Sequence, residues 1–382
     1  MLTLRQGSQA RRLIGILSIT GEFPVRSLHL LGKERVLRDL VRRMSVVQLV
    51  RNPDTGAQTE TRLLRLNGSG REKSIRLCKG ALPILDWLDP DAYRYYMASF
   101  WGHHFPGDAA HRDRNHRVAE TAAFCAGTGL EVFPYRLPPL QMERLCRAVP
   151  EEPSFYFARD LKKIHASEQN KTSFTRMVGA AFYPGGCYAV YNTRSAAMKW
   201  NGMGEFKAKH SLTEIARMNA DVQEIDAALL LGGSWETALE TLRETRANHR
   251  LAFRFDGIYR HVYFLPLNGF GMRRLRLLTL PDWRERLLSL VFEPENRSYD
   301  RGSMEYDACV DGVSVYSHLD GDLARLIRFR EAAETHSGKL EVLCFPEEAQ
   351  LLHAYLGREI SIKTIPMDVI EEALALPKEV WI

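Results

Sequence analysis

The residues whose spacing best fits a chemical reaction are Glu205 and Lys207, in the triplet Glu-Phe-Lys. In phosphodiester hydrolysis, clustered carboxylates hold a divalent cation and a lysine helps to position the attacking water. The triplet opens a predicted helix, however, where a glutamate also interacts favourably with the positive end of the helix dipole. The other carboxylates of such a site would be some of Asp256, Asp307 and Asp311.

Histidines and tyrosines gather between residues 93 and 116. A rolling-circle nickase needs two metal-binding histidines alternating on one strand and a tyrosine nucleophile on a helix. His103 and His104 are adjacent, so they cannot both face one side of a strand. We therefore expect aromatic packing between domains with the histidines at the surface; the residues concerned are His103, His104, His111, His116, Tyr93, Tyr95 and Tyr96.

Asp320-Gly-Asp322 follows the predicted strand 312–319, and the carboxyl ends of strands are where open α/β sheets bind ligands. Capping of the next helix by Asp320 or Asp322 explains the same residues without a ligand. No GxxxxGK[ST] loop or complete dinucleotide fingerprint occurs, so the sequence gives no support for ATP or NAD, and we expect no cofactor. The six cysteines form no CxxC pair, which argues against structural zinc.

Charge is distributed very unevenly along the chain. Residues 1–82 carry sixteen Lys/Arg against six Asp/Glu, whereas the remaining residues carry thirty-six against forty-one. A concentrated basic face binds phosphates by releasing condensed counterions, so the N-terminal segment predicts contact with nucleic acid. No apolar stretch reaches the ~18 residues of a membrane span, and the N-terminus lacks the features of a signal peptide, so we expect a cytoplasmic protein without membrane contact.

Three helices are predicted in this basic segment. Apolar residues repeat at helical spacing from Ser8 until Thr20-Gly-Glu-Phe-Pro24 interrupts them, and residues 25–31 and 33–44 form two further helices. In the third helix we expect Val36, Leu37, Leu40 and Val41 to face inward. Its arginines then remain available on other faces.

Two β-rich segments, 45–51 and 62–66, follow the third helix, and another begins at residue 74. Three helices followed by a β-hairpin is the order of a winged helix, in which the last helix lies in the DNA major groove and basic neighbours bind phosphates. The predicted DNA-binding residues are Lys33, Arg35, Arg38, Arg42, Arg43, Arg62, Arg65, Arg71 and Lys73.

The run RVLRDLVRRMSVVQLVR, followed by a wing and SIRLCKGALPIL, resembles the N-terminal winged helix of the replication-relaxation family, whose members are carried by conjugative plasmids and integrative elements. Leu77-Cys78-Lys79-Gly80 stands where that family has a Leu-Thr-x-x-Gly-like turn. Residues 113–134 are similar to the family's helix in which a histidine, here His116, precedes an apolar stripe. The resemblance implies a role in replication, mobilisation or transcription control.

The second half alternates apolar strands with amphipathic helices, which predicts a three-layer α/β domain closed by the strand at residues 360–366. A hairpin is predicted over 178–193 and a helix over 205–218. This order is also similar to that of the PD-(D/E)xK nuclease-like fold. Because neither hairpin strand carries a carboxylate, a restriction-endonuclease-like domain here would be inactive.

We therefore expect an α/β protein, α+β overall, with a winged-helix DNA-binding domain at 1–90, a helical connector at 91–150 and an α/β domain at 151–382. The expected function is that of a non-catalytic, double-stranded-DNA-binding accessory or regulatory protein of a mobile element. The α/β domain would bind a protein partner or a second copy of the chain. The alternatives are a divalent-metal nuclease and an interaction module whose basic helix meets an acidic protein.

Overall fold

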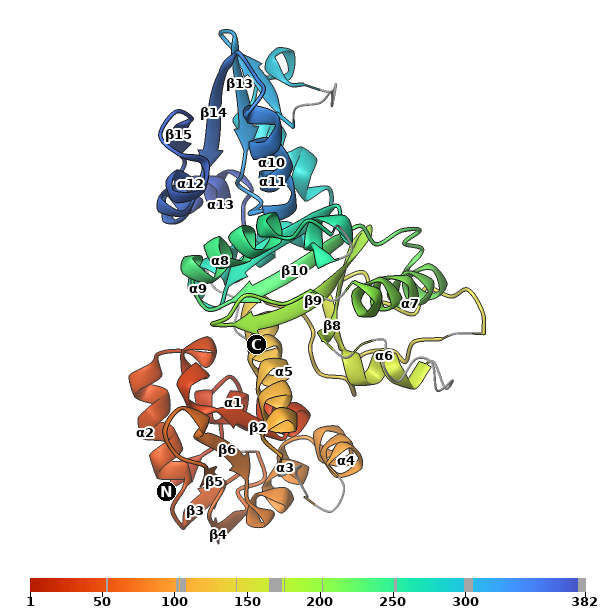
Figure 1. The fold of residues 1–382 in the computed structure, drawn as a ribbon. Helices are drawn as coiled ribbons and strands as arrows, with labels where there is room; N and C mark the ends of the chain where they lie inside the picture. Colours follow the sequence, from red (N-terminus) through yellow and green to blue (C-terminus); the bar gives the residue numbers. More distant parts are fainter. Residues whose placement is uncertain are drawn as a thin grey trace. The chain divides into compact units, whose positions relative to one another are not determined.

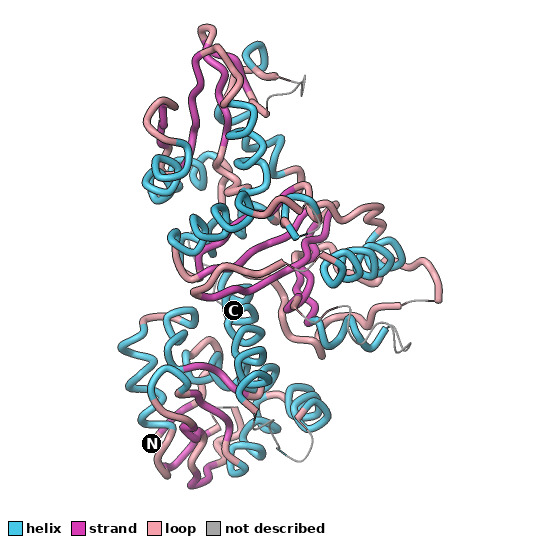
Figure 2. Tube along the Cα trace, viewed as in Figure 1, coloured by secondary structure: helices cyan, strands magenta, loops and turns pink. Residues whose placement is uncertain are grey.

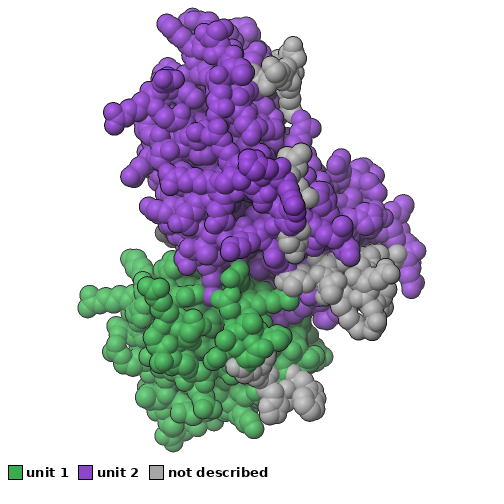
Figure 3. All heavy atoms as spheres, viewed as in Figure 1, with its two compact units in different colours: residues 1–139, 380–382 green, residues 140–379 purple. Residues whose placement is uncertain are grey.

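The structure is a computed structural model of the chain, and it describes residues 1–52, 54–100, 103, 108–141, 143–164, 174, 176–200, 202–250, 253–298 and 305–376. Helices and strands are mixed throughout, which confirms the expected α/β class (Figure 2). The chain divides into two compact units, Met1–Pro139 and Leu140–Glu379 (Figure 3). Each unit is described separately below.

The helices of the first unit pack around its sheets. Helix α5 contacts α1, β2 and η1, so residues 109–128 belong to the core of this unit rather than to a connector. Ser8 caps α1 by accepting a hydrogen bond from Arg11 N. The helices are α1 (Gln9–Thr20), α2 (Glu34–Met44), α3 (Leu82–Leu88), α4 (Pro90–Ser99) and α5 (Ala109–Thr128), with 3-10 turns η1 (Val25–Leu31), η2 (Gly70–Glu72) and η3 (Lys79–Ala81).

Two three-stranded sheets complete the first unit, with strand orders β1-β3-β4 and β2-β6-β5. The chain therefore forms two hairpins after α2, whereas the sequence predicted a single β-hairpin. In the structure the segment at 45–51 pairs with β4 and the segment at 62–66 pairs with β6. The strands are β1 (Leu2–Thr3), β2 (Glu22–Pro24), β3 (Gln48–Arg51), β4 (Gln58–Thr61), β5 (Leu64–Asn67) and β6 (Ser74–Leu77).

The second unit holds a five-stranded sheet of order β11-β10-β9-β8-β7. Its strands β8, β9 and β10 are labelled in Figure 1. Strands β7, β8 and β9 form an antiparallel meander, and β10 and β11 continue the sheet in parallel. The strands are β7 (Ser154–Phe157), β8 (Met177–Tyr183), β9 (Gly186–Arg194), β10 (Ala227–Gly232) and β11 (His261–Pro266), and the accompanying helices are α6 (Ala158–Ile164), α7 (Met203–Ala220), α8 (Trp235–Ala247), α9 (Gly269–Leu278) and α10 (Trp283–Val291).

A separate four-stranded sheet of order β12-β13-β14-β15 follows. The sequence predicted instead that the last strand completes one sheet shared by the whole domain. The single-sheet expectation is wrong because β13 pairs with β12 and β14 and not with β11. The elements are β12 (Ala308–Val310), β13 (Val313–Ser317), α11 (Leu323–Ala333), β14 (Lys339–Cys344), α12 (Ala349–Leu356), β15 (Ser361–Thr364) and α13 (Met367–Ala373), with 3-10 turns η7 (Phe255–Gly257), η8 (Pro294–Asn296) and η9 (Pro346–Glu348).

Asp322 joins the two sheets of the second unit. Its carboxylate accepts hydrogen bonds from Ala324 N and Arg325 N at the start of α11, which confirms the helix-capping interpretation. The same carboxylate accepts from Val262 N at 2.9 Å and from His261 Nδ1 at 2.6 Å, both on β11. One buried side chain therefore holds the end of β13 against the edge of the other sheet.

Among the described residues, no helix is both long enough and apolar enough to cross a membrane. All six cysteines are free thiols, and Cys309 is the exposed one.

Candidate nucleic-acid interface

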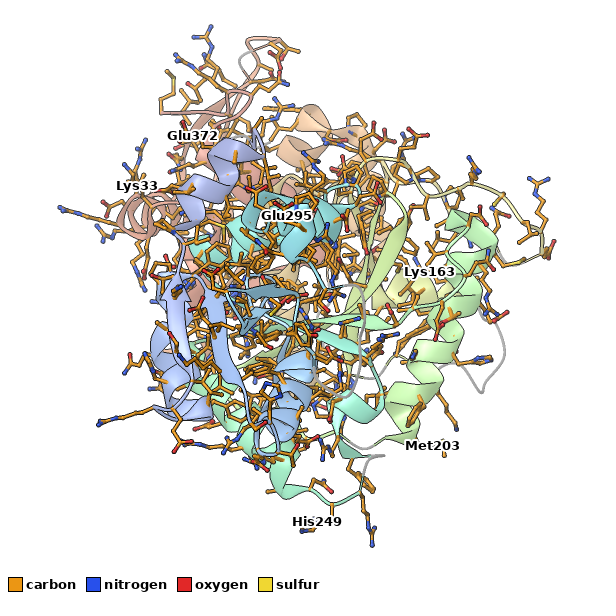
Figure 4. The ribbon with its side chains drawn as sticks, turned by 90° about the horizontal axis from the view of Figure 1, so that it is seen from above. Lys33, Lys163, Met203, His249, Glu295 and Glu372 are labelled. Atoms are coloured by element: carbon orange, nitrogen blue, oxygen red, sulfur yellow. The ribbon has the colours of Figure 1, made fainter. Side chains whose placement is uncertain are left out.

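Helix α2 presents a basic face to solvent. Leu37, Val41 and Met44, at positions i, i+4 and i+7, are buried and fix the helix against the unit. Glu34 in the first turn and two arginines in the last turn match the helix dipole. The exposed basic residues are Lys33, Arg35, Arg38, Arg42 and Arg43; Lys33 is labelled in Figure 4.

Two of these arginines have acidic partners within the helix. Arg38 donates to Glu34 at 2.6 and 2.8 Å, and Arg42 lies 3.3 Å from Asp39. These pairs are exposed, so they hold the guanidinium groups only weakly. Lys33, Arg35 and Arg43 form no ion pair within the described part of the chain, and their full charge faces the solvent.

The remaining predicted cations follow the second hairpin. Arg62 lies between β4 and β5, Arg65 is on β5, and Arg71 and Lys73 are in the turn that joins β5 to β6. All four are exposed. Because each strand residue advances the chain by about 3.3 Å, β5 spans about 10 Å from Leu64 to Asn67, so Arg71 and Lys73 lie beyond its far end.

Backbone hydrogen bonds connect this hairpin to α2 and η1. Leu63 N donates to Met44 O at 3.1 Å, which brings the chain beside Arg62 to the end of α2 beside Arg43. At the turn, Val25 N donates to Lys73 O at 2.9 Å. The structure therefore brings the basic end of α2 next to the base of the hairpin, and it anchors the turn to the start of η1.

Apolar side chains are exposed on the same elements. Val36, predicted to face inward, is 48% exposed, because the buried stripe of α2 runs through positions 37, 41 and 44. Val36 therefore adds an apolar contribution to this surface that helical periodicity did not predict. The exposed Arg5, Arg51 and Lys79 were not among the predicted cations either. The other exposed apolar residues of this region are Val46, Val47, Leu49 and Leu66.

A buried carboxylate, Glu22 on β2, holds the sheet that carries the second hairpin. It accepts hydrogen bonds from Ser74, from Arg76 at 2.6 Å and from His116 Nε2 at 2.9 Å. Burial alone would raise the pKa of Glu22, but the hydrogen bonds from His116, Ser74 and Arg76 lower the pKa to about 2. His116 is thus buried and ties α5 to the sheet, which corrects the expectation that it lies at the surface.

The other described histidines and tyrosines of the 93–116 region form no common cluster with His116. Tyr96 is buried within the first unit, and its hydroxyl lies 2.6 Å from His103 Nδ1. The exposed His111 lies 2.8 Å from Asp108, the cap of α5. His104 lies outside the described residues. Among the described residues, the ring of Tyr95 packs against Tyr135, and that of Tyr96 packs against Phe100 and His103, all inside the first unit.

In the second unit, three of the carboxylates considered for a metal site have basic partners of their own. Glu205 is buried 3.4 Å from Arg176, Asp256 lies 2.6 Å from Arg254, and Asp307 accepts from Arg325 at 2.7 Å. Asp311 and Lys207 are exposed. Across the described ranges, no three His, Cys, Asp or Glu side chains gather as metal ligands would.

The carboxyl end of β13 and β14 is filled by protein. Arg274 of α9 is fully buried there and binds both carboxylate oxygens of Glu348, one at 2.9 Å. Gly321 lies so close to the Arg274 guanidinium that any side chain at this position would collide with it. This edge, which binds ligands in many open α/β sheets, is therefore closed by the guanidinium group of Arg274 from helix α9.

Comparisons of the chain with protein-family models, with curated proteins and with solved structures found no match.

Proposed function

We propose that the chain is a non-catalytic DNA-binding accessory or regulatory protein of a mobile genetic element, and that its first unit docks on duplex DNA as a winged helix. In this proposal η1 and α2 form the helix-turn-helix, α2 enters the major groove, and the β5–β6 hairpin is the wing. Pairing of β2 with β6 beside β5 supports this assignment. The resemblance to the replication-relaxation family supports the mobile-element role.

One observation carries the proposal. Seven exposed cations on α2 and around the β5–β6 hairpin form no ion pair among the described residues, and the backbone bond between Leu63 and Met44 joins the two elements. Such a surface favours phosphate, because neutralising phosphates releases counterions from DNA. The seven are Lys33, Arg35, Arg43, Arg62, Arg65, Arg71 and Lys73.

The exposed Val36 extends the proposal to base contacts. It lies one position from Arg35 near the start of α2, the end of a recognition helix that commonly reaches base edges. An apolar side chain there can contact the methyl group of thymine, and an arginine can bind guanine. The second unit is left to bind a protein partner or a second copy of the chain.

Neutralising four of these cations tests the proposal. We expect the variant Arg35→Gln/Arg43→Gln/Arg71→Gln/Lys73→Gln to bind duplex DNA about 30-fold more weakly at 0.1 M salt, with a salt slope reduced by about 3. Fluorescence anisotropy of a labelled duplex, titrated at several salt concentrations, measures both quantities.

The matched control removes four exposed cations of the second unit, as Lys207→Gln/Arg243→Gln/Lys339→Gln/Arg358→Gln. This control has the same net charge as the test variant and should bind DNA as the unaltered protein does. An equal loss of DNA affinity in the two variants would show that overall net charge, and not this surface, determines binding. Unchanged binding in the test variant would refute the proposal. Absence of DNA binding at physiological salt would favour an acidic protein partner instead.

A divalent-metal nuclease remains the second candidate, and the order of elements in the second unit favours it. The meander β7-β8-β9, helix α7 and the parallel strand β10 follow one another in the order of the PD-(D/E)xK core. In this alternative Glu205 and Lys207 would act with Asp256, Asp307 or Asp311. A supercoiled-plasmid nicking assay with Mg²⁺ or Mn²⁺ tests it: nicking that is lost in Glu205→Ala would support the nuclease, and we expect no nicking.

A further inference from the structure

The first unit contains a cavity of about 220 Å³ that the proposed DNA contact does not use. It is lined by α1, by the α3–α4 junction and by residues 133–136. Leu85, Leu88 and Ala92 contribute apolar surface, and Phe133 and Tyr135 contribute aromatic rings. Pockets for drug-sized ligands measure about 300–1,000 Å³, so this cavity suits a ligand with a single ring.

Gly15 leaves one wall of the cavity without a side chain. It lies in the middle of α1, where glycine lowers helix stability relative to alanine. A Cβ atom at this position would approach the Phe133 ring no closer than 3.5 Å, an ordinary van der Waals contact. Packing therefore does not require glycine here, and its effect is to keep the space beside Phe133 open.

The charges that line the cavity favour an anion. Three arginines, Arg11, Arg12 and Arg136, and one carboxylate, Asp89, are among the lining residues. Arg136 is paired with Asp89 and, at 3.7 Å, with Glu131. Asp89 already caps α4 through Asp91 N and Ala92 N and accepts a hydrogen bond from Tyr135 Oη at 3.1 Å. The acidic group is thus engaged by the protein, and Arg11, which forms no ion pair among the described residues, keeps its positive charge at the cavity wall.

Two of the guanidinium groups are held in place at the wall. Arg11 Nη2 donates to Leu88 O at 3.1 Å, which leaves its other N–H groups for a ligand. Arg136 lies over the Phe133 ring at 4.6 Å and stays within 3.7 Å of Asp89. Aromatic surface therefore stands beside fixed cations, an arrangement suited to a flat ring that bears a carboxylate.

We propose that this cavity binds a small aromatic carboxylate, with the ring beside Phe133 and the carboxylate on Arg11. Salicylate is the probe, and salicyl alcohol, which keeps the ring and lacks the carboxylate, is its neutral control. Calorimetric titration of the full chain should give a Kd of about 1 mM or below for salicylate and at least tenfold weaker binding of the alcohol.

Two variants and a control locate the binding. Gly15→Leu fills the cavity and should abolish binding, while Arg11→Gln should weaken salicylate at least tenfold and leave the alcohol unchanged. Arg5→Gln removes an exposed cation that does not line the cavity and should have no effect. If Gly15→Leu does not fold, the salicylate affinity of Arg11→Gln compared with that of Arg5→Gln tests the proposal.

The proposal is overturned if salicylate does not bind, if the alcohol binds as tightly, or if Arg5→Gln weakens binding as much as Arg11→Gln does. The titration contains no DNA. A lack of salicylate binding would therefore not contradict the proposed DNA contact. A lack of DNA binding would likewise not contradict the proposed salicylate site.

Discussion

Replacing Arg274 with methionine will lower the free energy of unfolding of the second unit by about 3–5 kcal/mol. The substitution leaves the Glu348 carboxylate buried without its partner, and both residues are fully inaccessible to solvent. The guanidinium also donates to Phe264 O and lies 4.8 Å from the Phe270 ring, so its removal costs further contacts. Urea denaturation followed by circular dichroism measures the change, and hydrogen exchange assigns it to the second unit.

A double variant distinguishes an unpaired charge from lost packing. Burial raises the pKa of Glu348 even beside Arg274, so desolvation outweighs the attraction between the two charges. We therefore expect Arg274→Met/Glu348→Leu to regain most of the stability that Arg274→Met loses. Arg286→Met, at an exposed position of α10, should change stability by less than about 0.5 kcal/mol. A double variant as unstable as the single one would contradict this account.

Glu22→Gln will destabilise the first unit by about 3 kcal/mol at pH 7. The pKa of Glu22 is about 2 in the folded protein against an ordinary value of 4.5, so folding favours the charged form. A depressed carboxylate pKa stabilises the fold fully above the unfolded value, and the contribution is lost as pH falls from 4.5 towards 2. Urea denaturation at pH 7 and at pH 3 measures both the size and the pH dependence.

The difference between the unaltered protein and Glu22→Gln should therefore be about 2 kcal/mol smaller at pH 3 than at pH 7. Glu60→Gln, at an exposed position on β4, is the matched control and should leave stability nearly unchanged at both values. A difference for Glu22→Gln that does not vary with pH would show that lost packing, and not the charge, accounts for it.

Elements with strong local patterns could be predicted from the sequence. The predicted helix at 205–218 is α7 (Met203–Ala220), and the predicted hairpin at 178–193 is formed by β8 and β9. Helix α9 was not predicted, because its Gly-Phe-Gly start has low helix propensity. In the structure Asn268 caps it by accepting from Gly271 N at 3.0 Å.

The candidate interface could be predicted only in part. Charge content was sufficient to identify nine basic residues that are all exposed. Hairpin partners and the outward position of Val36 depend on which faces other elements cover, and local periodicity does not encode this. The contact between Glu22 and His116 joins residues 94 positions apart, so no short-range pattern could reveal it.

The way Asp322 and Arg274 join the two sheets determines how the protein can be shortened. A truncation between β11 and β13 would expose Asp322, His261 and the Arg274–Glu348 pair to solvent and remove their partners. Any expressed fragment of the second unit must keep both sheets. The division after Pro139 lies between the two compact units, so a cut there leaves these buried charges with the partners they need.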